Sequence, residues 1–504
     1  MPSSAKRAPL TLLVIFQAAI SAASLVVEIV AGRMLAPYVG MSLYTWTSVI
    51  AVVLAGFSAG HWWGGRIAER PTASALTRTG WLLLAAAVTT GGAVVMLRMI
   101  AGPIMGATDD YLWTITLLTL GVFFLPSLFA GIPAPVLAQT AVTGANGRSG
   151  RALGAMFAAG ALGAIGGTLL AGFVFIPWLG TAMTLAIVTV TYLAAATALF
   201  AMAGYRGKFL LPLAVAVLAL GLGVVSATRL SPCTHESQYY CIRVIDVSAD
   251  PARPVRRMVL NHLSHGTSAR DLPRVMFTEF TAMLDAIARG RMGDRQFSAF
   301  FIGGGTYSVP RAWADRKTGP VTVAEIDPRV TQVAIGDFWL DPGGMEILHQ
   351  DARRALLLRP GARYDVIIGD AFGDIAVPDH LITREFFGLV RSRLKEGGVY
   401  LMNVIDFPDG LEALAAIYET LKTVFPSVEI WTRESPPEPG QQRVFVLVSG
   451  SRPTGFSSLV APAPEPTRFA AFADVFYEQV LKQKRGLILT DNHAPIDWLL
   501  AQGL

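Results

Sequence analysis

The sequence predicts a multi-span α-helical membrane domain followed by an α/β Rossmann-like domain, with a small β-rich segment between them. The chain has 504 residues, of which 53% are hydrophobic and only 15% are charged, a balance far from that of an average soluble protein. Long apolar segments fill its first part. Short apolar runs then alternate with helix-like segments, which is the pattern of a mostly parallel sheet with helices on both faces. We expect the three parts over 1–229, 230–290 and 291–504.

Seven apolar segments of the first part are each near or above the ~20 residues that a helix needs to cross a bilayer. They cover about 10–32, 43–64, 79–101, 111–141, 152–176, 181–203 and 208–227. The fourth carries Pro126, Pro133 and Pro135, so it is either a kinked span or a span with a re-entrant piece, and the count stays open by one. More apolar segments follow the first one, so we expect it to be retained and not cleaved as a signal peptide. The expected partner is the lipid bilayer, in a multi-pass protein of the cell (inner) membrane.

The charges and cysteines limit other classes of function. The net charge of +5 is modest, and the basic residues flank apolar segments instead of forming a stripe, which gives no support for nucleic-acid binding. Cys233 and Cys241 lie eight positions apart after the last apolar segment. Their spacing supports a disulfide and two separate thiols equally, and it indicates no metal site.

A nucleoside-binding pattern organises the second half of the chain. An apolar run over 300–302 ends in Gly303, Gly304 and Gly305, and the next apolar run ends in Glu325. Glycines let backbone amides approach a ligand closely, and an acid about twenty residues further on accepts hydrogen bonds from ribose hydroxyls. The third glycine of G-x-G-x-x-G is missing, which favours a phosphate-free nucleoside such as S-adenosylmethionine over a dinucleotide. A glycine-rich turn in any doubly wound sheet is the alternative.

The remaining elements of the second half are predicted from periodicity and turn residues. Early strands are expected at 236–244 and 257–260, followed by a helix at 277–289. The later strands are expected at 297–302, 321–325, 345–349, 364–370, 398–404, 427–431 and 442–448. The later helices are expected at 308–317, 328–338, 352–358, 383–395, 409–423 and near 468–483. A loop should cover 450–466, and the tail over 489–497 should fold back on the domain.

Acidic residues close several of these strands. Ligands of such sheets bind at the carboxyl ends of the strands, so Glu325, Asp351 and Asp370 should share one rim with the glycine loop. Asp351 either receives an adenine amino group or only caps a helix. Asp370 and Asp374 are candidates to bind an amine and take its proton, although acids of a turn or a cap would have the same pattern.

These motifs carry a resemblance to a known family. The second half resembles the spermidine synthase family of polyamine aminopropyltransferases, and the whole chain resembles membrane-fused relatives with a multi-span N-terminal domain. The matching pieces are 236–237 with Tyr239 and Ile242, 303–305, 323–327, 350–352, 364–368 with Asp370, 385–387 and 394–399, together with 28–37 and 64–66 in the apolar part.

The resemblance implies a class I S-adenosylmethionine-methyltransferase-like fold, and S-adenosylmethionine or its decarboxylated form as substrate, with no metal. Glu325 would hold the ribose, Asp351 the adenine, and Asp370 would be the general base for a substrate amine. The residues implied to bind the adenosyl ligand are Gly303, Gly304, Gly305, Thr306, Glu325, Ile326, Asp351, Ala352 and Asp370. The implied catalytic residues are Asp370, Asp374 and Tyr240. A small-molecule amine and a second copy of the chain are the other partners considered.

The chain departs from the family in the part of the site that would bind the amine. Thr306 stands where the family has an acid, Tyr240 stands where it has Gln, and the position of another family Gln falls near His265. Asp370 and Asp374 are four residues apart instead of three. Each lost charge-assisted contact weakens polycation binding by roughly 1.5–3 kcal/mol. Three hypotheses therefore remain: aminopropyl transfer to an amine, an S-adenosylmethionine lyase or cyclising reaction that releases methylthioadenosine, and a non-catalytic sensor or transporter.

The sequence does not decide on which side of the membrane the second half lies. Basic residues mark alternate connections between the apolar segments, and loops rich in Lys and Arg face the cytoplasm. These residues are Lys6, Arg7, Arg66, Arg70, Arg78, Arg148, Arg151, Arg206 and Lys208, against Asp109 and Asp110 in an intervening connection. Seven spans would place the second half outside, which agrees with a disulfide and disagrees with a cytosolic supply of the adenosyl ligand.

Overall fold

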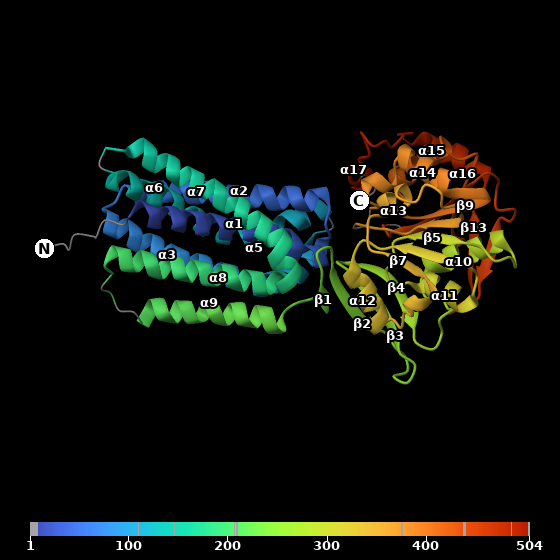
Figure 1. The fold of residues 1–504 in the computed structure, drawn as a ribbon, viewed down its shortest axis with the longest axis horizontal. Coiled ribbons are helices and arrows are strands. Elements are labelled where there is room, and N and C mark those ends of the chain that lie inside the picture. Colours follow the sequence, from blue (N-terminus) through green and yellow to red (C-terminus); the bar gives the residue numbers. More distant parts are fainter. Residues whose placement is uncertain are drawn as a thin grey trace. The chain divides into compact units, whose positions relative to one another are not determined.

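The computed structural model describes residues 9–108, 110–145, 147–205, 207, 210–373, 376–436, 440–484 and 486–501. They form two compact units, Met1–Cys241 and Ile242–Leu504. We call the first the helical unit and the second the sheet unit (Figure 1).

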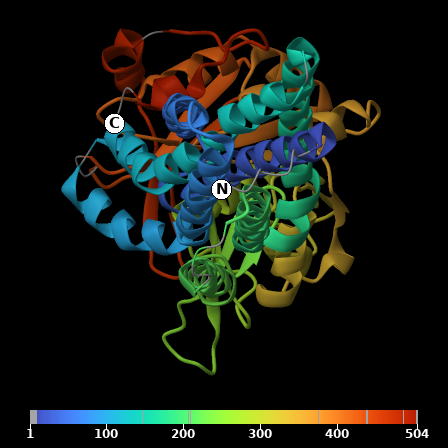
Figure 2. The ribbon, with the colours of Figure 1, turned by 90° about the vertical axis from the view of Figure 1, so that its left-hand side faces the viewer.

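Most of the helical unit is helical, and the described residues of the seven predicted apolar segments lie in these helices or at the caps between them. They are α1 (Leu10–Val39), α2 (Leu43–Ala68), α3 (Thr72–Gly91), α4 (Ala93–Ala107), α5 (Tyr111–Gly131), α6 (Pro133–Gly144), α7 (Ser149–Leu170), the π-helical η1 (Ala171–Phe175), α8 (Ile176–Ala203) and α9 (Leu210–Arg229). The fourth predicted segment is divided at Ile132 into α5 and α6, and the two helices together form one candidate span, Tyr111–Gly144. Helix α1 packs against α2, α5, α6, α7 and α8, so it lies inside the bundle (Figure 2).

Several of these helices are long and apolar enough to cross a membrane. By length and composition there are five among the described residues, or six if the bent pair α3–α4 is one span. The longest stretch, 149–203, has 55 residues and breaks at Gly180, whose φ of 76° is left-handed. An unbroken helix of that length would measure ~80 Å, more than twice the ~30 Å of a hydrocarbon core. Its two arms, before and after Gly180, are each long enough to span.

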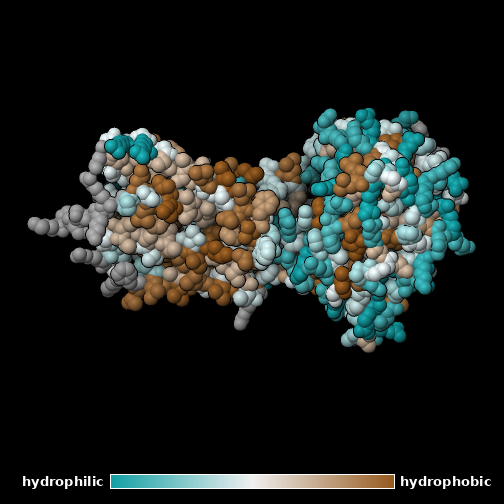
Figure 3. All heavy atoms as spheres, viewed as in Figure 1, coloured by the Kyte–Doolittle hydropathy of each residue, from teal (hydrophilic) through white to brown (hydrophobic). Residues whose placement is uncertain are grey.

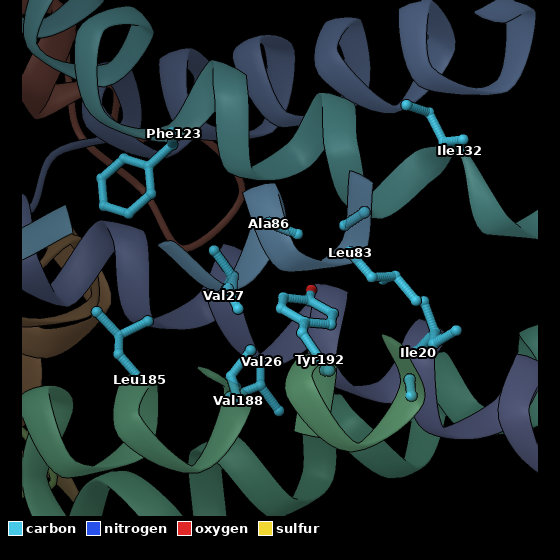
Figure 4. Close-up of a cluster of buried hydrophobic side chains, with 14 of the residues drawn as sticks. Ile20, Val26, Val27, Leu83, Ala86, Phe123, Ile132, Leu185, Val188 and Tyr192 are labelled. Carbon is cyan, nitrogen blue, oxygen red and sulfur yellow. The ribbon is translucent and has the colours of Figure 1, made fainter. Parts of the chain in front are cut away.

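Close backbone contact explains the small residues of α7. A Cβ added at Gly163 or Gly167 would collide with the carbonyl oxygen of Ala18 or Ala22 in α1, so only glycine permits this helix–helix approach. Elsewhere the core of the unit is built from larger side chains. Figure 4 shows residues of α1, α3, α5 and α8 around Tyr192, whose hydroxyl lies 3.4 Å from that of Ser24.

The predicted strand over 236–244 is wrong, because a turn divides it into β1 (His235–Glu236) and β2 (Cys241–Asp246). In the turn, the Ser237 hydroxyl accepts hydrogen bonds from the backbone N–H groups of Tyr239 and Tyr240, at 3.0 and 2.8 Å. A serine that bonds the backbone two and three residues on competes with strand pairing. Of the two alternatives for the cysteines, the structure has the disulfide, between Cys233 and Cys241.

The sheet unit begins with small antiparallel pairings and continues into a large mixed sheet. Its elements before the large sheet are β2, β3 (Val255–Leu260), β4 (Leu263–Ala269) and α10 (Glu279–Met292). Next come β5 (Ala299–Ile302), α11 (Ser308–Arg316), β6 (Val321–Ala324), α12 (Pro328–Asp337), η2 (Pro342–Gly344), β7 (Glu346–Leu348), α13 (Ala352–Leu357) and β8 (Tyr364–Gly369). The unit ends with η3 (Asp379–Leu381), α14 (Arg384–Arg393), β9 (Leu394–Asp406), α15 (Glu412–Lys422), β10 (Ser427–Arg433), β11 (Arg443–Gly450), β12 (Ser458–Ala461), β13 (Thr467–Ala471), α16 (Asp474–Gln479), η4 (Leu481–Gln483) and α17 (Ile496–Ala501).

The large sheet has the strand order β12-β13-β10-β11-β9-β8-β5-β6-β7. From β7 to β9 neighbouring strands are parallel, and from β9 to β12 they are antiparallel. Alternating side chains of β5 divide the core into two layers. Phe300 and Ile302 pack with α13, α14 and α15, whereas Ala299 and Phe301 pack with α10 and α11. The parallel half therefore has helices on both faces, as predicted.

The predictions beyond residue 450 are partly wrong. The expected loop over 450–466 contains β12, and the expected helix near 468–483 begins as β13, which pairs with β10 from Trp431 opposite Ala471. Phe469 of β13 is fully buried, so pairing and burial override the local helical pattern. The tail does fold back, and the backbone N–H of Arg384 donates to the carbonyl of Leu489.

Candidate active site

The glycine loop brings the ends of two strands together. Ile302 lies opposite Gly369 in the parallel pair β5–β8, so Gly303 and Asp370 follow at the same edge. Gly303 has a φ of 95°, and a Cβ there would collide with the carbonyl oxygen of Asp370. Only glycine suits this backbone and this contact. The loop is thus fixed directly beside the candidate base.

Glu325 closes β6 and holds the loop through its carboxylate. One oxygen accepts from the backbone N–H of Gly304 at 2.8 Å, and the other from that of Asp327 at 2.9 Å. Burial raises the pKa of Glu325, and these backbone hydrogen bonds act in the opposite direction. A carboxylate has about four acceptor positions, so both oxygens keep capacity for ligand hydroxyls. Ile326, which follows, is 36% exposed and offers an apolar surface at the rim.

Asp370 closes β8 and is the candidate proton acceptor. Its Oδ1 accepts a hydrogen bond from the Asn403 side-chain amide at 2.9 Å, and its backbone N–H donates to Ile302. Burial raises the pKa of Asp370 to about 6, and the Asn403 hydrogen bond limits the rise. A carboxylate that titrates near neutral pH is suited to general-base work.

Asn403 is a site residue that the sequence analysis missed. It lies on β9 and is only 2% exposed, and its Oδ1 is a buried atom without a hydrogen-bond partner among the described residues. The signal was present, because Asn403 is the one polar residue in the apolar run 399–404. A lone polar side chain near the carboxyl end of a parallel strand is a candidate for ligand contact.

Strand β4 covers the glycine loop from the other side. A Cβ at Gly266, with φ of 131°, would collide with the Thr306 side chain, and a Cβ at Gly305 would be 2.8 Å from the carbonyl oxygen of His265. The His265 ring lies edge-on to Phe372, with centroids 6.4 Å apart. This strand therefore carries His265 to the loop, close to the turn that follows Asp370.

The His265 ring is held as a neutral hydrogen-bond acceptor. Nδ1 lies 3.0 Å from the carbonyl oxygen of Leu263, and a carbonyl only accepts, so Nδ1 carries the proton and Nε2 has the lone pair. Burial lowers the pKa of His265, against the effect of that hydrogen bond.

Two predicted ligand residues are used in internal contacts. Thr306 is 2% exposed, and its hydroxyl lies 2.7 Å from that of Ser308. Asp351 caps α13 by accepting from the backbone N–H of Arg354 at 2.9 Å, and it pairs with Nε2 of His380 at 2.7 Å. The hydrogen bond from His380 holds the pKa of Asp351 below its usual range. The capping interpretation of Asp351 is confirmed, and its role toward adenine stays a prediction.

The structure brings together most of the predicted rim. Gly303, Gly304, Gly305, Glu325 and Asp370 meet at the carboxyl ends of β5, β6 and β8. Ala352 is buried at the start of α13, behind its cap.

Asp374 and Tyr240 are the other two residues predicted to be catalytic. Asp374 lies outside the described residues. Tyr240 belongs to the helical unit, in the turn of Ser237. Their catalytic roles stay predictions.

The strand order, with antiparallel strands added at one side of a parallel half, and the glycine–acid rim define a Rossmann-like fold of the methyltransferase class. No family model matches the chain. The C-terminal part is related in sequence to curated polyamine aminopropyltransferases.

The similarity covers a limited stretch of each relative. The chain is 31% identical over 153 residues to a probable polyamine aminopropyl transferase of Bifidobacterium longum, which covers 30% of this chain and 34% of the relative. It is 29% identical over 154 residues to a polyamine aminopropyltransferase of Vibrio vulnificus, with 29% and 48% covered. The chain thus spans about a third to just over half of the length of the curated relatives it matches.

Among solved structures, a probable spermidine synthase from Corynebacterium glutamicum is similar with a TM-score of 0.44 and 18% identity, over 51% of this chain and 95% of that one.

Proposed function

We propose that the sheet unit transfers an aminopropyl group from decarboxylated S-adenosylmethionine to a small amine and releases methylthioadenosine. The observation that carries the proposal is Asp370, a base with a pKa of about 6 held by Asn403 directly beside the glycine loop. The relationship of the C-terminal part to proteins named polyamine aminopropyltransferase supports the same class of reaction.

The proposed step is a nucleophilic displacement at carbon. The amine nitrogen attacks the carbon next to the sulfonium sulfur, so a C–N bond forms and a C–S bond breaks. The electron pair of the broken bond returns to sulfur, which leaves as a neutral thioether. The nitrogen loses one proton to Asp370. Because Asn403 binds Oδ1, we assign the proton to Oδ2.

The adenosyl portion is proposed to bind across the ends of β5 and β6. Glu325 would accept hydrogen bonds from the ribose hydroxyls, and Ile326 would pack against the adenine. Asp351 would accept from the adenine amino group while it caps α13. The buried Oδ1 of Asn403 supports a role in binding as well, because a buried acceptor without a protein partner is satisfied by a ligand N–H.

The helical unit is proposed to insert this enzyme into a membrane. Large apolar side chains point outward along it, including Phe157 at 71%, Leu162 at 68% and Trp178 at 83% exposure. Figure 3 shows hydrophobic residues over much of the visible surface of this unit, while the sheet unit is mostly hydrophilic. Such a surface is stable in lipid and costly in water.

A second candidate is a lyase or cyclising reaction of S-adenosylmethionine that also releases methylthioadenosine. One observation favours it. Beside the glycine loop the chain has uncharged Thr306 and neutral His265, and neither supplies the negative charge that holds a polycation strongly.

The deciding experiment follows methylthioadenosine by chromatography from detergent-purified full-length protein. One sample receives decarboxylated S-adenosylmethionine with putrescine, and another receives S-adenosylmethionine alone. Product only in the first supports aminopropyl transfer, and product in the second supports the lyase. The Asp370→Asn variant should lose product in either case and keep ligand affinity by calorimetry. Binding without product in the unaltered protein would contradict both reactions and support a sensor.

A further inference from the structure

A short disulfide-closed segment is fastened to one end of the helical unit. The segment runs over 231–241 and contains the Cys233–Cys241 bond. The Glu236 carboxylate accepts hydrogen bonds from the backbone N–H and the hydroxyl of Thr181, at 2.6 and 2.9 Å. The Arg33 guanidinium donates to the carbonyl of Ser237 at 2.9 Å and also to that of Tyr239. Glu236 of the segment and Arg33 of α1 thus anchor the segment to the bundle.

These anchors identify the end of the bundle at which the segment lies. Arg33 is near the end of α1, and α2 begins at Leu43, only a few residues after α1 ends. Thr181 begins the second arm of the stretch 149–203, immediately after the break at Gly180. Helix α9 also ends there, because the segment follows it directly. We call this the disulfide end (Figure 1).

The opposite end of the bundle carries arginines. Helix α2 starts at the disulfide end, so Arg66 in its last turn lies at the far end, with Arg70 in the connection to α3. Helices α5 and α6 return to the far end, where Arg148 and Arg151 lie at the start of α7. The connection to α5, at the disulfide end, has the single Arg98 in α4 and then Asp110, which caps α5.

An aromatic side chain also marks the arginine end. The Arg66 guanidinium lies 3.6 Å from the centroid of the Trp62 ring, and Trp62 is 64% exposed. Tryptophan next to a cation is the usual composition of a helix end at the boundary between lipid and water. Anionic lipid head groups of the cytoplasmic leaflet attract such basic connections.

Two independent observations agree on the orientation. Short loops with Lys and Arg stay in the cytoplasm, and disulfides persist in oxidising compartments. We infer that the disulfide end faces the oxidising, non-cytoplasmic side of the membrane and that the chain leaves the bundle there to form the sheet unit. The inference rests on the proposed membrane insertion and not on the proposed chemistry. Its consequence is that the adenosyl ligand reaches the rim from outside or across the membrane.

The first test uses the native cysteines, which are the chain's only two. Full-length protein in a bacterial host with a periplasm is trapped with acid and treated with a mass-tagged maleimide. We expect no tag without reductant and two tags after reduction. In a host without its periplasmic thiol oxidase, tags should appear without reductant. Two tags without reductant in the ordinary host would overturn the inference.

The second test measures the orientation directly. In the cysteine-free background of Cys233→Ser and Cys241→Ser, Ser149→Cys and Ala249→Cys each introduce one thiol. Both positions are exposed, at the start of α7 and in the β2–β3 connection. We expect a membrane-impermeant maleimide to label the Ala249→Cys protein in intact spheroplasts, and the Ser149→Cys protein only after permeabilisation. The reverse pattern overturns the orientation, and recovery of the protein in the soluble fraction overturns the insertion on which it rests. The test with native cysteines covers the case in which the background does not fold.

Discussion

Asp370 is the residue on which the proposed chemistry depends, and its titration predicts a pH profile. A general base must be deprotonated, and burial raises the pKa of Asp370 to about 6. The rate of methylthioadenosine release should therefore be constant above pH ~7 and fall as the pH drops through about 6. Asp370→Asn should lower kcat by ~10²–10⁴-fold without a matching rise in KM. A variant with full activity would exclude Asp370 as the base.

Asn403 is expected to set the pH at which the rate of methylthioadenosine release falls. Its amide donates to the charged form of Asp370, and a hydrogen bond to a charged group contributes ~1.5 kcal/mol, or about one pH unit. In Asn403→Ala the acidic limb should move up by about one unit. The control is Thr322→Val, in the neighbouring strand β6, because Thr322 bonds Glu346 and not the rim. An unmoved limb in Asn403→Ala would show that Asn403 does not tune the base.

The sequence predicted the two acidic residues of the rim, but it did not predict the residues that contact the rim. Glu325 and Asp370 follow wholly buried strands, so their place at strand ends was readable from apolar runs. Asn403 was missed, because which residue of β9 faces Asp370 depends on strand register. The cover of β4 over the loop was also missed, since a contact between Gly266 and Thr306 is non-local.

Among the elements, the glycine loop makes the sharpest stability prediction. Gly303→Ala places a Cβ against the Asp370 carbonyl at a φ of 95°, and such strain costs ~1–3 kcal/mol. We expect a lower Tm together with loss of adenosyl-ligand binding by calorimetry. Gly336→Ala in α12 is the matched control, because nothing lies within 4 Å of its added Cβ. The control should be neutral or stabilising by up to ~1 kcal/mol. Equal effects of the two changes would argue against a strained loop.

The returning tail is tied to α13 by the ion pair between Asp491 and Arg353. Asp491 accepts two hydrogen bonds from Arg353 of α13, at 2.8 and 2.6 Å, and one from Thr383 at 2.7 Å. The Arg353 hydrogen bonds lower the pKa of Asp491 to about 2. Asp491→Asn should destabilise the protein by ~0.5–1 kcal/mol, since the pair is partly exposed.

The pH dependence of this tail contact has a definite sign. Because the folded pKa is below that of an unfolded aspartate, near 4, the stabilisation is full above pH ~4 and is lost as the pH falls toward about 2. Thermal unfolding in detergent across pH measures it. The more exposed pair of Glu434 with Arg468 is the control, and Glu434→Gln should change stability by less than ~0.5 kcal/mol. A larger effect in the control would refute a special role of the tail.

The local sequence pattern predicted the helices and strands that have strong hydrophobic periodicity. It failed for segments whose structure depends on strand pairing. The helices and parallel strands between β5 and α15 matched closely, because each combines an apolar run with a cap or a turn. Strands β12 and β13 did not, since they are only four and five residues long. Strand β13 forms by pairing with β10, and β12 forms by pairing with β13. The turn at Ser237 shows the reverse case, in which a side-chain hydrogen bond ends a strand that alternation predicted to continue.

At the scale of the whole molecule, composition alone separated the two units, and each has the surface its expected solvent requires. The helical unit exposes large apolar side chains, whereas the sheet unit exposes charges paired on its surface. Composition did not decide between the two alternatives for Cys233 and Cys241, because the disulfide needs the turn that brings them together.

Two leucines of similar exposure test whether lipid surrounds the helical unit and water surrounds the sheet unit. Leu162 in α7 is 68% exposed, and Leu358 after α13 is 63% exposed. If lipid surrounds α7, Leu162→Arg places a charge in hydrocarbon, which costs ~2.5–3.5 kcal/mol near the middle of a membrane. Leu358→Arg places the same charge in water and should be neutral. We expect the Leu162→Arg protein to show a several-fold lower yield in carbonate-washed membranes, while Leu358→Arg and Leu162→Ala match the unaltered protein. Equal yields of the two arginine variants would mean that the apolar face of α7 is covered by something other than lipid.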